Sequence, residues 1–148
     1  MTFDELLSDY RQRFPWHGFF ELRKGEKIGI RAKEEGVPDK PGVYLVYGYK
    51  DGRSELLYIG KSGTLHEDGD EFSDQKLLRR ITKGKQDGMP RRAFFPEQMK
   101  LLGLEALIFY WFVTFTLNVK VIPAKAEADL LQAYFDEYDK LPLWNKSI

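Results

Sequence analysis

Hydrophobic residues at the start of the chain recur at the spacing of an amphipathic helix, and they are Phe3, Leu6, Leu7, Tyr10 and Phe14. Thr2 and Glu5 have the spacing of a capping box, which predicts that the helix begins directly after Thr2. Pro15 ends the pattern, because proline cannot donate the next helical hydrogen bond. Residues 18–40 are rich in Gly, Glu and Lys, so we expect a loop there, with a short strand near residues 27–31.

Two apolar stretches, residues 43–49 and residues 54–59, have the composition and length of β-strands. Asp51-Gly52 stands between them, and this dipeptide readily adopts the positive φ angles of a tight hairpin turn. The pattern therefore predicts a β-hairpin that turns at Asp51-Gly52.

The next segment predicts helices separated by irregular chain. Residues 63–72 look like an acidic, irregular insertion, and Ser73 can cap a helix that runs to about Lys83. Residues 85–92 contain glycine and proline and predict a loop, whereas residues 96–102 favour a short helix.

An aromatic stretch over residues 106–117 predicts a long strand at the centre of a sheet. Pro123 suits the first position of a helix, which we expect to run to about Asp139 and to be followed by an extended tail. A hairpin, a central strand and several helices predict an α+β fold, with a small, mainly antiparallel sheet flanked by helices.

Composition narrows the class of protein. The chain has 148 residues, which predicts one domain over residues 1–148, and 43% of them are hydrophobic, enough for a core. It has no cysteine, which excludes disulfides and cysteine metal sites and fits a cytoplasmic location. The longest apolar run, residues 106–113, is too short to span a bilayer, so we expect no membrane partner.

Charge is balanced in total but uneven along the chain. Lys plus Arg and Asp plus Glu both number 23, which argues against a strong non-specific nucleic-acid binder. Basic residues gather over 76–100, between acidic stretches at 64–75 and 127–139. Such runs are often only solvated surfaces, but a basic stretch beside acidic ones could also hold a phosphate backbone and a metal in one cleft.

Two short motifs carry the clearest functional signal: Gly42-Val43-Tyr44 and, on the next predicted strand, Tyr58-Ile59-Gly60-Lys61. Tyrosines are common in strands for packing alone, but glycine beside them leaves room for a ligand. The pair of motifs resembles the GIY-YIG nuclease domain, in which two tyrosines line a metal-dependent phosphodiester-cleaving site. The resemblance spans roughly residues 41–145 and leaves residues 1–40 as an N-terminal helix and extension.

The resemblance implies roles for both tyrosines. Tyr44 would deprotonate the attacking water, directly or through a relay, and Tyr58 would position the water or the phosphate. A tyrosine base must overcome its ordinary pKa of about 10, and a cation such as Lys61, or a metal, lowers that pKa. A strict two-residue turn would put the tyrosines on opposite faces of the sheet, so we predict an odd loop or a β-bulge that brings them to one face.

The predicted helix before Lys83 carries two adjacent arginines. At about 100° per residue, Arg80 lies at the edge of the apolar face and Arg79 lies nearly opposite it. Leu77-Leu78-Arg79-Arg80-Ile81 is similar to the catalytic-arginine helix of the family, which implies that Arg80 stabilises charge on the phosphate. The sequence departs from the family at Gly84, where many members carry histidine or tyrosine.

Glu127 begins the apolar stripe of the last predicted helix, which continues at Leu130, Leu131, Tyr134 and Tyr138. A first-turn acid is favoured by the helix dipole alone, but the resemblance implies that Glu127 holds the metal. Mg²⁺ prefers oxygen ligands and keeps several waters, so one carboxylate can suffice. Asn145 matches an asparagine that follows this helix in the family, or it simply hydrogen-bonds the tail backbone.

Together these features predict a metal-dependent endonuclease that hydrolyses DNA with Mg²⁺ or Mn²⁺; RNA and a dimeric state remain open. The residues expected to contact the nucleic acid are Arg79, Lys83, Lys85, Arg91, Arg92 and Asn145. Two alternatives come from other classes: a non-catalytic nucleic-acid-binding module and a protein-interaction module that retains the fold.

Overall fold

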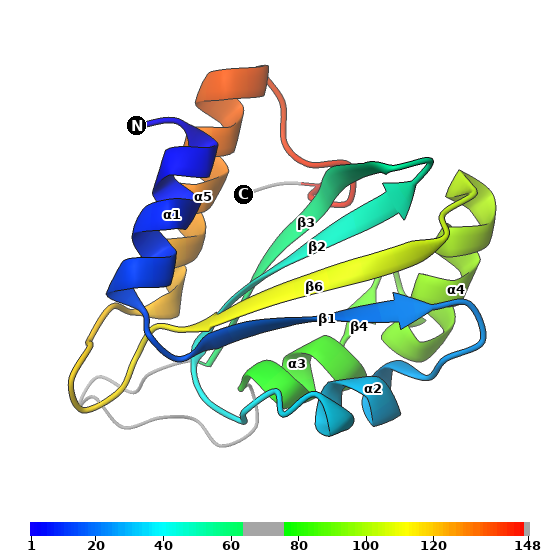
Figure 1. Ribbon diagram of the computed structural model, residues 1–148, viewed down its shortest axis with the longest axis horizontal. Coiled ribbons are helices and arrows are strands. Elements are labelled where there is room, and N and C mark those ends of the chain that lie inside the picture. Colours follow the sequence, from blue (N-terminus) through cyan, green and yellow to red (C-terminus); the bar gives the residue numbers. More distant parts are fainter. Residues whose placement is uncertain (64–75, 147–148) are drawn as a thin grey trace.

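The computed structural model describes residues 1–63 and 76–146, and its centre is a four-stranded antiparallel sheet (Figure 1). In spatial order the strands are β1 (His17–Arg23), β6 (Ala106–Val113), β2 (Gly42–Lys50) and β3 (Arg53–Ser62). The α+β prediction is confirmed, and the aromatic strand is interior as expected, although it ends at Val113.

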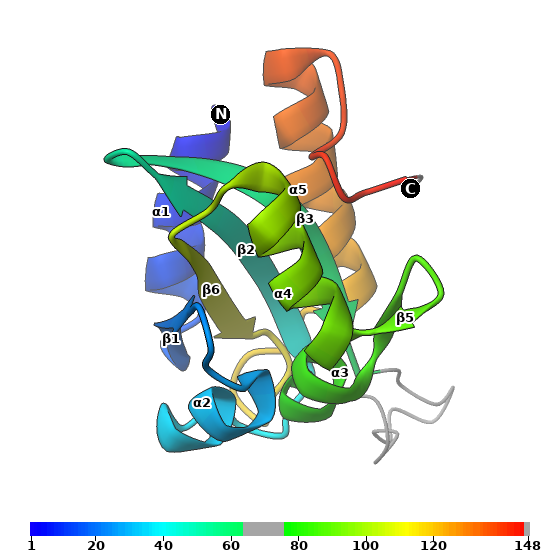
Figure 2. The ribbon, with the colours of Figure 1, turned by 90° about the vertical axis from the view of Figure 1, so that its right-hand side faces the viewer.

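Helices cover both faces of this sheet (Figures 1 and 2). One face carries α1 (Phe3–Arg13) and α5 (Pro123–Tyr138), and the other carries α2 (Ile28–Glu34), α3 (Leu77–Lys83) and α4 (Arg91–Leu102). Each face has its own buried cluster, because successive side chains of a strand point to opposite faces. Within the described residues, no helix has the length and hydrophobicity needed to cross a membrane.

The N-terminal region is partly as predicted. Thr2 and Glu5 form the expected capping box at the start of α1. The expected loop over 18–40 is wrong, since it contains most of β1 and all of α2, and the short strand expected near 27–31 lies largely within α2. In β1 only Phe20 and Leu22 are buried, so the alternation of buried and exposed residues is weak. The strand is defined instead by its pairing with β6.

The hairpin of β2 and β3 contains a one-residue irregularity. Its turn is the predicted two-residue turn, with φ of 51° at Asp51 and 77° at Gly52. The register then shifts, because Tyr47 pairs with Leu56 whereas Val46 pairs with Tyr58, which leaves Leu57 as an extra residue. A two-residue turn alone would put Tyr44 and Tyr58 on opposite faces of the sheet, so a β-bulge was predicted. The bulge is present and places Tyr58 on the same face as Tyr44.

A second small hairpin replaces the loop expected over residues 85–92. It is formed by β4 (Lys85–Gln86) and β5 (Met89–Pro90), with φ of 51° at Asp87 and 76° at Gly88. The helix that follows begins at Arg91, five residues earlier than expected, so Pro96 lies inside it. The predicted insertion and the Ser73 cap fall on residues 64–75, outside the described residues.

Candidate active site

Tyr44 of β2 and Tyr58 of β3 form a close pair, with ring centroids 6.0 Å apart and planes inclined at 46°. Tyr44 is fully buried and Tyr58 is partly buried. Gly60 lies beneath both rings: a Cβ there would lie 2.5 Å from Cζ of Tyr44 and 2.7 Å from Cε2 of Tyr58. We expected this glycine to leave room for a ligand, but the space it leaves is filled by the two tyrosines.

Arg91, the first residue of α4, completes this cluster. Its Nη1 donates hydrogen bonds to Oη of Tyr44 at 2.7 Å and to the carbonyl oxygen of Arg80 at 2.5 Å. Its guanidinium carbon lies 5.4 Å from the ring centroid of Tyr44 and 5.5 Å from that of Tyr58. We expected Arg91 to contact a nucleic-acid backbone; it is 2% exposed, so that expectation is wrong.

The position of Arg91 follows from the β4–β5 hairpin. Its backbone N–H donates to the carbonyl oxygen of Gly84 at 3.1 Å, which closes the hairpin and directs the first residue of α4 toward the sheet. Nothing in the basic run of the sequence separates this buried arginine from its exposed neighbour Arg92. The Asp87-Gly88 dipeptide, a hairpin signal of the same kind as Asp51-Gly52, is the feature that could have revealed it.

Glu127 lies near the N-terminus of α5 and is partly buried. Burial raises the pKa of this carboxyl, whereas the charges of Lys61 and Arg80 lower that pKa. The pKa of Tyr58 is raised to about 12, mainly by burial and then by Tyr44 and Glu127, while the charges of Arg91 and Arg80 oppose the rise. Tyr58 is therefore a protonated hydrogen-bond donor at neutral pH.

These electrostatic effects are short in range, so they show which predicted residues the fold brings together. They join Glu127 to Lys61, Arg80 and Tyr58, although these residues come from three different elements, α5, β3 and α3. Arg79 exerts no such effect on either group, which agrees with the prediction that Arg80 is the arginine facing the site.

The donor set at this site fits a hard cation held by few protein ligands. Among residues 1–63 and 76–146, no group of three or more His, Asp or Glu side chains could hold a metal. Glu127 belongs to no such group among these residues, and the ion pairs found in that part of the chain do not include it. Mg²⁺ accepts one carboxylate when waters and phosphate oxygens complete its coordination.

The remaining predicted cations line one side of the molecule. Arg79, Lys83, Lys85 and Arg92 are exposed on α3, β4 and α4. Helix α3 has three basic residues and no acid, whereas α5, across the sheet, has one lysine and four acids. The balanced net charge therefore conceals a basic side and an acidic side.

Asn145 has a structural role at the edge of β3. Its Oδ1 accepts from the backbone N–H of Ile59 and its Nδ2 donates to the carbonyl of Ile59, both at 3.0 Å. The adjacent Trp144 N–H donates to the carbonyl of the bulge residue Leu57 at 2.8 Å. The amide thus engages the strand rather than the tail backbone. A contact between Asn145 and nucleic acid stays a prediction. The tail fixes β3 directly beside Tyr58.

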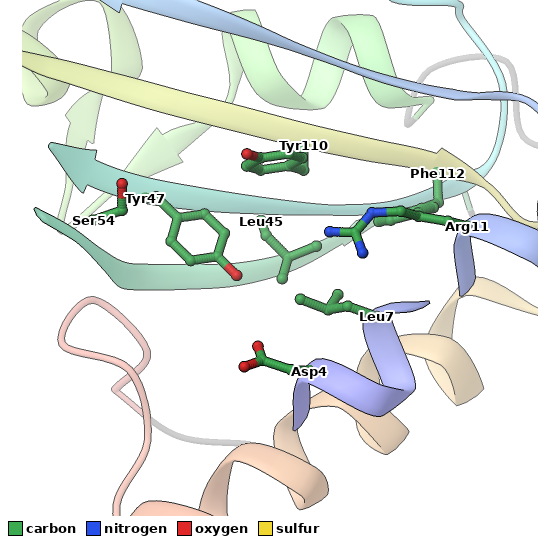
Figure 3. Close-up of a pocket in the computed structure, with 8 residues that line it drawn as sticks. All are labelled: Asp4, Leu7, Arg11, Leu45, Tyr47, Ser54, Tyr110 and Phe112. Atoms are coloured by element: carbon green, nitrogen blue, oxygen red, sulfur yellow. The ribbon is translucent and has the colours of Figure 1, made fainter. Parts of the chain in front are cut away.

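A separate cavity of about 190 Å³ lies on the opposite face of the sheet, beneath α1 (Figure 3). Tyr47 and Tyr110 stand edge to face there, with centroids 5.4 Å apart. Asp4 and Arg11 line the cavity from the first and last turns of α1, positions that the helix dipole favours for these charges. None of the predicted site residues lines this cavity.

Comparison of the chain with protein-family models, with curated proteins and with solved structures gives no match. The functional interpretation therefore rests on the motifs and on the geometry of the Tyr44–Tyr58 site.

Proposed function

We propose that the protein is a metal-dependent endonuclease of GIY-YIG type, which hydrolyses phosphodiester bonds of DNA. The observation that carries the proposal is the bulge at Leu57. It brings Tyr44 and Tyr58 to one face of the hairpin. The charges of Glu127 and Arg80 act on Tyr58, and those of Lys61 and Arg80 act on Glu127.

The two tyrosines have different environments, which supports different roles. Tyr58 keeps its proton at neutral pH, so it donates a hydrogen bond to the attacking water or to a phosphate oxygen. Oη of Tyr44 already accepts a hydrogen bond from the Arg91 guanidinium, and a charge-assisted bond of this kind stabilises negative charge on the oxygen. Tyr44 is therefore the better candidate for the base: once its hydroxyl proton has passed to solvent along a relay, its oxygen can take up the proton of the attacking water, directly or through that relay.

The cations supply electrostatic stabilisation. Arg80 and Lys61 are exposed, so both can reach a phosphate that approaches Glu127. As water attacks phosphorus and the bond to one ester oxygen breaks, Arg80 stabilises the charge that develops on the phosphate oxygens. Glu127 would hold the Mg²⁺ or Mn²⁺, which supplies Lewis-acid stabilisation of the phosphate and of the leaving oxygen.

The basic side of the molecule would hold the rest of the nucleic acid. Arg79, Lys83, Lys85 and Arg92 flank Arg80 and are exposed, as backbone-contacting residues must be. Each cation that neutralises a phosphate adds roughly one unit to the salt dependence of binding. We infer that these residues set affinity, whereas Arg80 sets rate.

One observation favours a second candidate, a nucleic-acid-binding module without catalysis. Within residues 1–63 and 76–146 Glu127 belongs to no metal-ligand group of three or more side chains, and burial disfavours its charged form. In such a module DNA binding would persist without metal and would not depend on Glu127.

The deciding experiment measures cutting of supercoiled plasmid and of a branched oligonucleotide with Mg²⁺ or Mn²⁺. Wild type is compared with Glu127→Gln and with the matched control Asp129→Asn, whose carboxylate pairs with Lys125 on the exposed side of α5. Cutting by wild type and the control, but not by Glu127→Gln, supports the nuclease. Equal cutting by all three rejects Glu127 as metal ligand. Salt-sensitive binding in EDTA without any cutting supports the binding module.

A further inference from the structure

Arg91 is the one charged side chain that is buried among the residues that the structure describes. Its Nε has no hydrogen-bond partner, and no ion pair in the described part of the chain includes it. Burying a cation without an anion costs free energy unless other contacts offset it. Its partners are a hydroxyl, a carbonyl and three aromatic rings, the third being Phe95 at 5.9 Å.

Both hydrogen-bond partners of Arg91 belong to the proposed active site. Nη1 reaches Oη of Tyr44 on β2 and the main-chain carbonyl of Arg80 on α3, so one nitrogen joins two elements that are far apart in sequence. A guanidinium remains protonated and cannot accept a hydrogen bond. Arg91 therefore fixes Oη of Tyr44 as an acceptor on this side.

The absence of a side chain at Gly84 leaves space for the Arg91 guanidinium. A Cβ at residue 84 would lie 3.6 Å from both Cζ and Nε of Arg91, in van der Waals contact, and 2.9 Å from the carbonyl oxygen of Arg80. A longer side chain built from that point would compete with Arg91 for the space behind Tyr44. The chain has no side chain there, and Arg91 approaches Tyr44 through this space.

We propose that Arg91 is the positioning residue of the site: it acts through Tyr44, whose hydroxyl it orients and whose developing negative charge it stabilises. This inference rests on the proposed function. Arg91 is too buried to touch DNA itself, so its effect must pass through Tyr44 and through the placement of Arg80. If Arg91 only supported the fold, replacing it would slow cleavage by the same factor with or without the Tyr44 hydroxyl.

A double-mutant cycle tests the proposal. Single-turnover cleavage is measured for wild type, Arg91→Met, Tyr44→Phe and the double variant, with Arg11→Met as the matched control beside the other tyrosine pair. We expect Arg91→Met to slow cleavage by about 100-fold when Tyr44 is present. In the Tyr44→Phe background the same change should cost about threefold or less, because the two side chains act as one unit. Arg11→Met should cut like wild type.

Chemical rescue distinguishes a role of Arg91 in orienting Tyr44 from a role in folding. Arg91→Ala leaves space for a free guanidinium ion, so adding guanidinium below denaturing concentrations should restore part of the rate. Arg91→Lys, which keeps the charge but not the planar fork, should retain more activity than Arg91→Met.

The proposal is overturned by any of three results. One is an equal loss from Arg91→Met with and without Tyr44. Another is failure of both guanidinium and Arg91→Lys to recover activity in variants that melt like wild type. A wild type that cuts no substrate rejects the proposed function and the role of Arg91 together. The first two results, obtained with an active wild type, reject the role of Arg91 alone.

Discussion

Strand β2 carries a tyrosine pair on each of its faces, and the two pairs differ both in the angle between their rings, 46° and 78°, and in the charges around them. Tyr44 meets Tyr58 at 6.0 Å, and Tyr47 meets Tyr110 at 5.4 Å. Burial raises the pKa of a tyrosine in both pairs. The buried cation of Arg91 opposes the rise at Tyr58, whose pKa reaches about 12. On the second face, burial and then the Asp4 carboxylate raise the pKa of Tyr47, and the cation that opposes this rise, Arg11, is exposed (Figure 3).

The comparison indicates that two neighbouring tyrosines do not by themselves mark a catalytic site, and that the charged groups around them matter. Rings at this spacing occur in ordinary sheets because aromatic side chains pack well there. Among the described residues, only the Tyr44–Tyr58 pair lies beside a buried guanidinium. The charges of Arg80 and of the partly buried Glu127 also act on Tyr58. The predictions that follow alter one face and use the other, or a neighbour, as the control.

Gly60→Ala should have the largest effect, because its Cβ would collide with both rings of the Tyr44–Tyr58 pair. We expect loss of cleavage and about 1–3 kcal/mol of destabilisation. Gly29→Ala in α2 meets no atom within 4 Å and should be neutral or stabilising by up to about 1 kcal/mol. Urea denaturation and plasmid cutting measure both effects. An active, stable Gly60→Ala protein would contradict the ring packing.

Tyr44→Phe should reduce the cleavage rate by about 10²–10⁴-fold, the range typical of losing a general base. It also removes the acceptor of Arg91, which should cost about 1–3 kcal/mol of stability. Tyr47→Phe, on the opposite face, should cut at the wild-type rate. Equal losses from the two variants, measured by single-turnover kinetics and urea denaturation, would show that the tyrosines serve only the fold.

Arg80→Ala should lower the single-turnover rate by about 10²–10³-fold, because it removes a charge that stabilises the transition state. Arg79→Ala should leave this rate nearly unchanged and reduce the salt slope of DNA binding by about one. Fluorescence anisotropy at several salt concentrations measures the second effect. The assignment would be reversed if Arg79→Ala lost rate and Arg80→Ala lost only affinity.

The smallest effect concerns stability and pH at Glu127. Because burial raises the pKa of this carboxyl, the folded state binds more protons than the unfolded state between the ordinary value, about 4.3, and the raised one. Stability contributed by this group is therefore present below that window and lost as pH rises through it. Glu127→Gln should remove this loss, so the difference in unfolding free energy between wild type and variant should change across the window. Urea denaturation at a series of pH values measures it, and parallel pH curves would contradict the burial of the carboxyl.

Local chemistry accounts for the features that the sequence predicted correctly. The Thr2–Glu5 capping box, the Asp51-Gly52 turn and the Pro123 start of α5 each depend on residues adjacent in sequence. The bulge was predictable from the requirement that Tyr44 and Tyr58 share a face. The apolar stripe of α5 is correct at Leu130, Leu131 and Tyr134, although Tyr138 is half exposed.

Tertiary contacts account for the features that were missed. Strand β1 has only two buried residues and exists through its pairing with β6, which a local pattern cannot report. Arg91 and Arg92 are identical in type and adjacent, yet only Arg91 is buried, because α4 starts at the end of a second hairpin. The Asn145 side chain accepts a hydrogen bond from Ile59, which lies 86 residues earlier in the sequence.

The bulge separates the register of the hairpin tip from the register of the tyrosine pair. If Leu57 paired with Val46 and no bulge formed, Tyr58 would turn to the face of α1 and α5, away from Tyr44. Deleting Leu57 would instead leave Val46 opposite Tyr58, so both tyrosines would keep their shared face. Adding residues at the tip of the hairpin, between Lys50 and Arg53, would also leave the pairing of both tyrosines intact. Among descendants of this chain that keep the tyrosine pair, insertions and deletions should therefore collect at the hairpin tip and at the bulge.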